Sequence, residues 1–253
     1  MKYLENLQRK KIFNLGYVTT LTGNEMTAKS LLSSYKKNGY IQSIRRNLYV
    51  ALDLASKNPL ANRFEIGSSV NQGAYISHHS ALEYHGVANQ VFYTITVSSS
   101  KVFQPFEYDG IGYEFCNSKI ESGVSSPFQT PNVKVTDIER TVADCIFDIE
   151  RAGGTEEIIE SLKLLPMLDE TKLISYLDEY AHIFLWQKTG YLLENLKDSL
   201  RISNDFLNEC KCHIHNRKNY LDRQSDMVYQ PDWKLYVPKN LFNSIDEGGD
   251  FLV

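Results

Sequence analysis

The residues with the clearest chemical meaning lie in the segment NGYIQSIRRNLYVAL (residues 38–52), which reads as two short strands joined by a turn. Arg45, Arg46 and Asn47 occupy the tip of that turn. Asparagine tolerates the positive φ that tight hairpin turns need. The adjacent arginines would then project beyond the strands, where guanidinium groups suit phosphate oxygens or a narrow minor groove. The alternative explanation is a solvated turn that charge keeps soluble.

The helix predicted before this hairpin carries a second set of residues suited to nucleic acid. Its apolar residues Ala28, Leu31, Leu32 and Tyr35 share one face, and no acidic residue occurs from 26 to 52. Small hydroxyl groups let a helix sit deep in a major groove, and lysines hold phosphates. An ordinary amphipathic helix with a solvated polar face is the alternative. The candidate DNA-binding residues are Thr27, Lys29, Ser30, Ser33, Ser34, Lys36, Lys37, Arg45 and Arg46.

The charge distribution also favours a polyanion partner for this part of the chain. The net charge of the whole chain is −4, but the first 50 residues contain nine basic and two acidic side chains. The remainder contains 18 basic and 29 acidic side chains. A basic head on an acidic body predicts a nucleic-acid-binding module joined to a region with another task.

A zinc site is the first of the other chemistries that the sequence suggests. Cys210, Cys212, His213 and His215 form the dense cluster CKCHIH. Structural zinc usually takes two separated ligand pairs, and the other two cysteines stand alone. We therefore interpret the cluster as a helix end with buried thiols and predict no metal site and no cofactor.

A nuclease centre is the second alternative chemistry that the sequence suggests. The segment QPDWK resembles the Pro-Asp start of a metal-dependent nuclease core, but no acidic-x-Lys pair follows it. Asp232 is therefore predicted to lie in a loop or at a strand end. His78, His79 and His85 flank one short helix with no neighbouring nucleophile motif, so we interpret them as capping or packing residues. No catalytic residue is predicted.

The elements that must position the basic residues can be predicted from local signals. A first helix with apolar residues at helical spacing ends at Gly16, and a short second helix has Thr19 or Thr20 as its N-cap. The third helix begins after Thr27 as N-cap and stops at Gly39. Three helices followed by a hairpin are the order of a winged helix-turn-helix, predicted here over residues 1–55.

The sequence pattern of residues 56–253 predicts a mixed α/β body. The expected fold class of the whole chain is therefore α+β. Residues 60–150 alternate strands and helices, with Pro59 starting one helix and a capping box from Thr136 to Glu139 starting another. Residues 151–253 form a helix-rich C-terminal part with a break near Pro166 and a final edge strand. The patterned apolar sequence continues to Phe251, Leu252 and Val253, which predicts no long disordered tail.

Composition indicates a cytoplasmic protein. Four scattered cysteines and an N-terminus without an apolar signal region favour reduced thiols in the cytoplasm. No apolar stretch approaches the roughly 20 residues that a membrane span needs, so no membrane partner is expected.

Five stretches, taken in order, resemble antitoxins of the AbiEi type over nearly the whole chain. They are RRNLYV, ISHHSALEYHGV, TDIERTVADCI, TGYLLENL and DWKLYVP. Two departures stand out. Asn47 replaces the usual glycine of the wing, and Lys188-Thr189 replaces an arginine-leucine pair, so no contact is carried over to Lys188.

The resemblance implies a task for each part of the chain. The N-terminal winged helix would bind inverted repeats in the promoter DNA of its own operon and repress it. The larger C-terminal region would counteract a cognate AbiEii-like nucleotidyltransferase toxin, in a type IV toxin–antitoxin system of abortive infection and phage defence, without requiring a stable complex. The alternative is a DNA-targeted enzyme, such as a metal-dependent nuclease with a winged-helix head.

Overall fold

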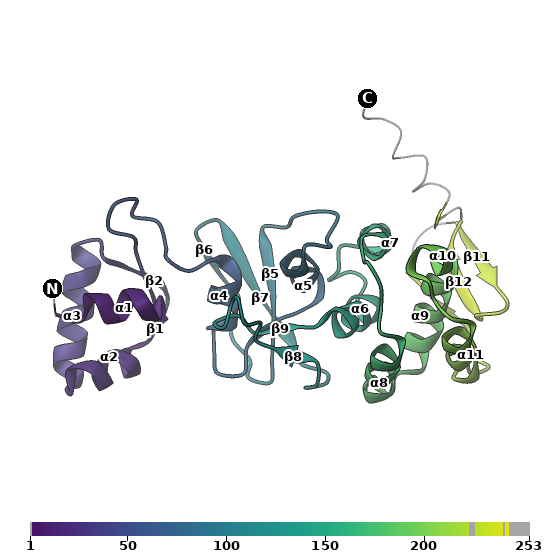
Figure 1. The fold of residues 1–253 in the computed structure, drawn as a ribbon, viewed down its shortest axis with the longest axis horizontal. Coiled ribbons are helices and arrows are strands. Elements are labelled where there is room, and N and C mark those ends of the chain that lie inside the picture. Colours follow the sequence, from purple (N-terminus) through teal and green to yellow (C-terminus); the bar gives the residue numbers. More distant parts are fainter. Residues whose placement is uncertain (1, 223–225, 240, 243–253) are drawn as a thin grey trace, which may run out of the picture. The chain divides into compact units, whose positions relative to one another are not determined.

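The computed structural model describes residues 2–222, 226–239 and 241–242. Within these residues the chain forms eleven helices and twelve strands in three sheets, a mixed α/β content that agrees with the predicted α+β class (Figure 1). The chain divides into two compact units. No helix in the described part is long and apolar enough to cross a membrane. The predicted division at residues 55 and 56 stays a prediction.

The first unit comprises Met1–Ile76, Tyr93–Asn117 and Ser126–Lys134. It contains α1 (Leu4–Lys10), β1 (Ile12–Phe13), α2 (Leu15–Thr22), α3 (Glu25–Lys37), β2 (Ile41–Arg45), β3 (Leu48–Ala51), α4 (Arg63–Ser68), β4 (Tyr75–Ile76), β5 (Thr94–Ser99), β6 (Phe106–Tyr108) and β7 (Ile111–Asn117).

The start of the chain differs from the prediction because a strand replaces the end of the first helix. α1 ends at Lys10, and Ile12 and Phe13 pair antiparallel with Val50 and Tyr49 of β3. Both side chains are buried, Phe13 in the N-terminal core, and this favours the strand over the helical spacing that Ile12 shares with Leu4 and Leu7. The resulting sheet has the order β1-β3-β2.

The helix caps also differ from those predicted. Asn14 caps α2 by accepting a hydrogen bond from the Tyr17 N–H at 2.9 Å, so neither Thr19 nor Thr20 is the cap. Asn24 caps α3 by accepting from the Thr27 N–H at 3.0 Å. Asparagine is a stronger N-cap than threonine, so each helix begins earlier.

Gly39 ends α3 as predicted, and another glycine, Gly23, ends α2. Gly23 is left-handed at φ 74° and allows the tight turn into α3. Gly39, at φ 65°, follows α3, and the N–H of Tyr40 then donates to the carbonyl of Tyr35 at 3.0 Å. This is the Schellman arrangement, which satisfies carbonyls at the end of the helix.

The remainder of the first unit is a sheet flanked by α4. The strands run in the order β6-β7-β5-β4, with β5 parallel to β7 and the other pairs antiparallel. Pro59 does not start a helix. It forms a bridge with Leu52, and α4 begins after a capping box formed by Asn62 and Glu65. The side chains of Asn62 and Glu65 accept hydrogen bonds from two backbone N–H groups at the start of the helix, whereas the proline side chain has no hydrogen-bond acceptor.

The second unit comprises Ser77–Phe92, Ser118–Ser125 and Val135–Val253. It contains α5 (His78–His85), β8 (Val124–Ser125), β9 (Val135–Thr136), α6 (Ile138–Phe147), α7 (Thr155–Lys163), α8 (Glu170–Tyr180), α9 (Ile183–Asn195), α10 (Lys197–Leu200), α11 (Asn204–Cys212), β10 (Asn219–Tyr220), β11 (Met227–Gln230) and β12 (Leu235–Pro238).

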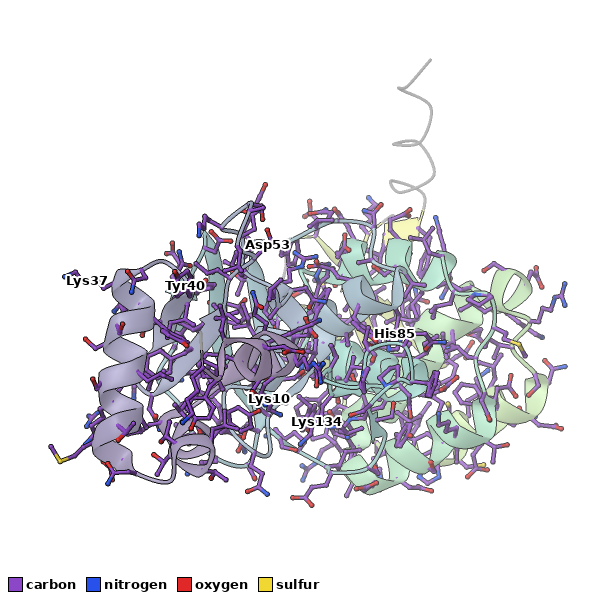
Figure 2. All side chains as sticks on the ribbon, turned by 60° about the vertical axis from the view of Figure 1, so that its left-hand side comes forward. Lys10, Lys37, Tyr40, Asp53, His85 and Lys134 are labelled. Atoms are coloured by element: carbon purple, nitrogen blue, oxygen red, sulfur yellow. The ribbon has the colours of Figure 1, made fainter. Side chains whose placement is uncertain are left out.

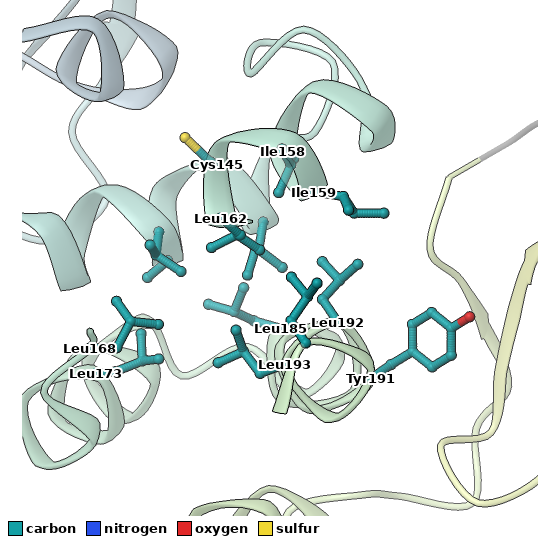
Figure 3. Packing of buried hydrophobic residues seen from close by; sticks show 14 of the residues in the cluster. Cys145, Ile158, Ile159, Leu162, Leu168, Leu173, Leu185, Tyr191, Leu192 and Leu193 are labelled. Carbon is teal, nitrogen blue, oxygen red and sulfur yellow. The ribbon is translucent and has the colours of Figure 1, made fainter. Parts of the chain in front are cut away.

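A continuous apolar core holds the second unit together. Side chains from α6, α7, α8 and α9 converge in it, among them Cys145, Ile158, Leu173 and Leu192 (Figure 3). The helical character predicted from residue 155 to residue 212, with its break near Pro166, is confirmed. Burial of this apolar surface is the main source of stability for such a helical layer.

Two predictions for the second unit are corrected. Asp137, not Thr136, caps α6 by accepting from the Arg140 N–H at 2.9 Å, while Thr136 belongs to β9. The final strand is not at an edge, because β12 lies between β10 and β11. The predicted apolar end at Phe251–Val253 lies outside the described residues.

Candidate nucleic-acid interface

The polar face of α3 presents all seven of its candidate residues to solvent. Ala28, Leu32 and Tyr35 bury the opposite face of the helix in the N-terminal core. The Tyr35 hydroxyl also donates to the carbonyl of Lys2 at 2.5 Å and holds α3 against the start of the chain. The exposed residues are Thr27, Lys29, Ser30, Ser33, Ser34, Lys36 and Lys37.

The two ends of α3 differ in charge. At the first turn, Glu25 forms an ion pair with Lys29 at 2.6 Å, and the hydrogen bond from Lys29 lowers the pKa of this carboxyl. At the last turn, Lys36 and Lys37 are exposed, and Figure 2 shows Lys37 at the end of the helix. The uncompensated positive charge of α3 therefore lies toward its C-terminal end.

The β2–β3 turn consists of Arg46 and Asn47, since Arg45 pairs with Leu48. Asn47 has φ 60°, as its position at the tip predicts. Its side-chain oxygen accepts from the N–H of Leu15 at 2.9 Å, which fixes the tip against the start of α2. Arg46 is exposed at this anchored tip and is free to contact a ligand.

Arg45 does not project into solvent with Arg46. Its guanidinium carbon lies 5.6 Å from the centre of the Phe103 ring and 5.1 Å from that of Phe106. Its Nη1 is buried and finds no hydrogen-bond partner among the described residues. These cation–π contacts occupy the faces of the guanidinium and make Arg45 part of the support of the hairpin. Nothing in the local sequence of the hairpin signals this role, because both rings come from a later segment.

Two adjoining cavities lie in the first unit, and one of them borders the hairpin tip. One has a volume of about 530 Å³ and is lined by Arg46, by Arg45 and by the segment from Ser69 to Gln72. The other has a volume of about 260 Å³. The basic side chains that line them include Lys101 and Lys134, neither of which is among the predicted DNA-binding residues. Both lysines lie far along the chain from the basic head, so no local pattern in the sequence indicates that they line the same cavities.

The residues of the CKCHIH cluster are spread over different environments. Cys210 is buried in α11, and burial raises the pKa of its thiol to about 12. Cys212 is exposed, and the ring of His213 stacks on Trp186 with centroids 4.0 Å apart. Among the described residues, no group of three or more His, Cys, Asp or Glu side chains is placed to hold a metal ion.

The histidines around α5 are packing and hydrogen-bonding residues, as we predicted. The ring of His79 contacts Glu83 at 3.1 Å and Glu157 at 3.0 Å, and His85 contacts the carbonyl of Thr136 at 2.7 Å. His78 is buried, and burial lowers its pKa. Figure 2 shows where His85 lies.

Asp232 and Lys188 lie in other parts of the second unit. Asp232 is exposed in the turn before β12, in agreement with its predicted loop position. Lys188 lies in α9 and lines a cavity of about 380 Å³ together with Asp148 and Asp222. Burial lowers the pKa of its ammonium group.

Comparison with known proteins shows a likeness of fold. No family model matches the chain, and no curated protein matches it. The crystal structure of the Rv2827c protein from Mycobacterium tuberculosis superposes with a TM-score of 0.65 at 13% sequence identity. The alignment covers 97% of this chain and 94% of that one. The two chains therefore share their fold over nearly their full length.

Proposed function

We propose that this protein binds double-stranded DNA through its N-terminal region as a winged helix-turn-helix, with α3 as the recognition helix and β2–β3 as the wing. The observation that carries this proposal is the joint exposure of the polar face of α3 and of Arg46. Both surfaces belong to the part of the chain with the strongest positive charge. The tight turn at Gly23 and the hairpin after Gly39 support the same assignment.

The proposed operator and the proposed antitoxin activity rest on the resemblance to AbiEi-type antitoxins. We propose that the DNA target is the promoter of the protein's own operon and that the acidic second unit counteracts a nucleotidyltransferase toxin. Four of the five matching stretches contribute to helices or strands of that unit. In TGYLLENL and DWKLYVP, Gly190 makes room for Trp233, whose Nε1 donates to Glu194 at 2.5 Å. These stretches therefore support the packing of the unit.

Binding to promoter DNA should depend strongly on salt. If about five phosphates are contacted, affinity should fall by roughly two to three decades between 50 and 200 mM salt. Changing Ser30 or Ser33 to alanine should alter the preference among operator sequences more than the overall affinity, because base contacts carry specificity. Fluorescence anisotropy with the upstream promoter and a scrambled duplex measures both effects. Equal affinity of the wild type for the two duplexes would argue against promoter recognition.

Neutralisation of the toxin should occur without a tight complex. The described residues show a folded body rather than a polar segment of the kind that folds on a toxin surface. Calorimetry of the purified protein with the purified toxin should show no binding at submicromolar concentrations, while co-expression still protects cells. A stoichiometric complex of submicromolar affinity would make this a direct-binding antitoxin.

A further inference from the structure

The cavity beside the hairpin tip adjoins a second cavity, and both are lined by residues of the first unit. They share five lining residues, namely Lys10, Ile12, Ser69, Asn71 and Gln72. We call the combined surface the basic groove. Its basic lining residues are Lys10, Lys11, Arg45, Arg46, Lys101 and Lys134. Figure 2 shows the positions of Lys10 and Lys134.

The single acidic side chain in the lining compensates Lys11 and leaves the other basic residues to set the charge of the groove. Glu65 is 5% exposed and accepts a hydrogen bond from Lys11 at 2.8 Å. Its other oxygen accepts from the N–H of Asn62 at 3.0 Å in the cap of α4. The carboxylate is therefore compensated and engaged inside the protein. Lys10, Lys101 and Lys134 are exposed, so the groove presents a positive surface in a protein whose net charge is −4.

The wall of the groove is held in place by hydrogen bonds across the unit. The Asn71 amide donates to the carbonyl of Lys101 at 3.1 Å and accepts from the Ser99 hydroxyl at 3.0 Å. The Lys134 ammonium donates to the carbonyl of Gln72 at 2.8 Å. The Asn71 bonds join the segment after α4 to the residues at the end of β5, and the Lys134 bond joins that segment to the residue before β9. The backbone at Lys101 and the ammonium group of Lys134 are thereby held to the same segment.

We propose that the basic groove binds the sugar-phosphate backbone of duplex DNA that flanks the segment read by α3. The proposal rests on the proposed function and names a second contact for the same DNA. Phosphate oxygens accept hydrogen bonds from lysine and arginine and from amide and hydroxyl groups, all of which line the groove. Arg46 contributes to both the wing tip and the groove, so one strand can pass from one surface to the other.

The test compares two duplexes that contain the operator sequence, one of about 10 base pairs (one helical turn) and one of about 20 base pairs. The variant combines Lys101→Gln with Lys134→Gln in the full chain. On the longer duplex, loss of two phosphate contacts should weaken binding by about 30-fold near 0.15 M salt and reduce the salt slope by about two. Binding of the shorter duplex and the preference among operator sequences should not change.

Two controls accompany this variant. Lys57→Gln with Lys218→Gln removes the same charge from exposed lysines that do not line the groove and should leave both affinities unchanged. Lys101→Arg with Lys134→Arg keeps the charge and should retain the wild-type salt slope. Circular dichroism checks that every variant is folded.

The outcomes separate the groove from the proposed function. If Arg46→Ala weakens binding but the double glutamine variant retains the affinity and salt slope of the wild type, the groove assignment is wrong and the winged helix stands. Equal losses on both duplexes, or tighter binding of a single-stranded probe, would also overturn the assignment to flanking duplex DNA. If the wild-type protein binds no duplex, both proposals fail.

Discussion

A variant with Lys36→Glu, Lys37→Glu and Arg46→Glu should lose DNA binding and keep toxin protection. Three exposed positive charges at the end of α3 and at the wing tip become negative. Loss of three phosphate contacts together with the new repulsion should weaken operator binding by about 1,000-fold or more near 0.15 M salt. Fluorescence anisotropy measures the binding, and expression of a reporter from the operon's promoter measures repression.

The same variant distinguishes the two proposed tasks of the chain without truncation. The changes lie on exposed side chains of the first unit, so the second unit should remain folded. Cells that co-express the toxin should survive as they do with the wild-type protein. The exposed-lysine variant Lys57→Gln with Lys218→Gln serves as the control for altered charge. Retention of repression by the triple variant would contradict the assignment of α3 and the wing as the DNA-binding surface, whereas loss of protection would link neutralisation to DNA binding.

The second large effect concerns the stability of the second unit. Arg140→Ala should lower the free energy of unfolding by about 3–5 kcal/mol, because it leaves the carboxylate of Asp144 buried without its cation. Arg140 Nε donates to Asp144 Oδ1 at 2.6 Å, and both side chains are almost completely buried. Arg140 Nη1 also donates to the carbonyl of Ser122 at 2.6 Å, and the hydroxyl of Tyr180 donates to Asp144. Chemical denaturation followed by circular dichroism measures the change.

The chain offers a matched control for this substitution. Arg151 pairs with Asp148 at 3.3 Å, with side-chain exposures of 29% and 38%. Arg151→Ala should therefore cost less than about 1 kcal/mol. Replacing both Arg140 and Asp144 by leucine should recover part of the loss, since no unpaired charge remains. Equal stability of the Arg140→Ala and Arg151→Ala variants would contradict the assignment of the buried Arg140–Asp144 pair as a contact on which the stability of the second unit depends.

The sequence by itself determined the features that depend on neighbouring residues. Gly23 and Gly39 end their helices because a left-handed residue is cheapest as glycine, and Asn47 forms the hairpin turn for a related reason. The alternation of strands and helices within residues 60–150, and the helix-rich part after residue 151 with its break near Pro166, followed from local patterns. The polar face of α3 was likewise visible as a pattern with a period of one helical turn.

The tertiary structure decided what depends on partners distant along the chain. Ile12 and Phe13 form a strand because they pair with Val50 and Tyr49 at the open edge of β3, and no local window contains these partners. Arg45 supports the hairpin because Phe103 and Phe106 lie against it, so Arg46 is the exposed one of the two arginines. Long-range contacts of this kind are made when the chain packs its apolar surface. That packing places Lys101 in the cavity that Arg46 also lines, and Lys134 in the adjoining cavity.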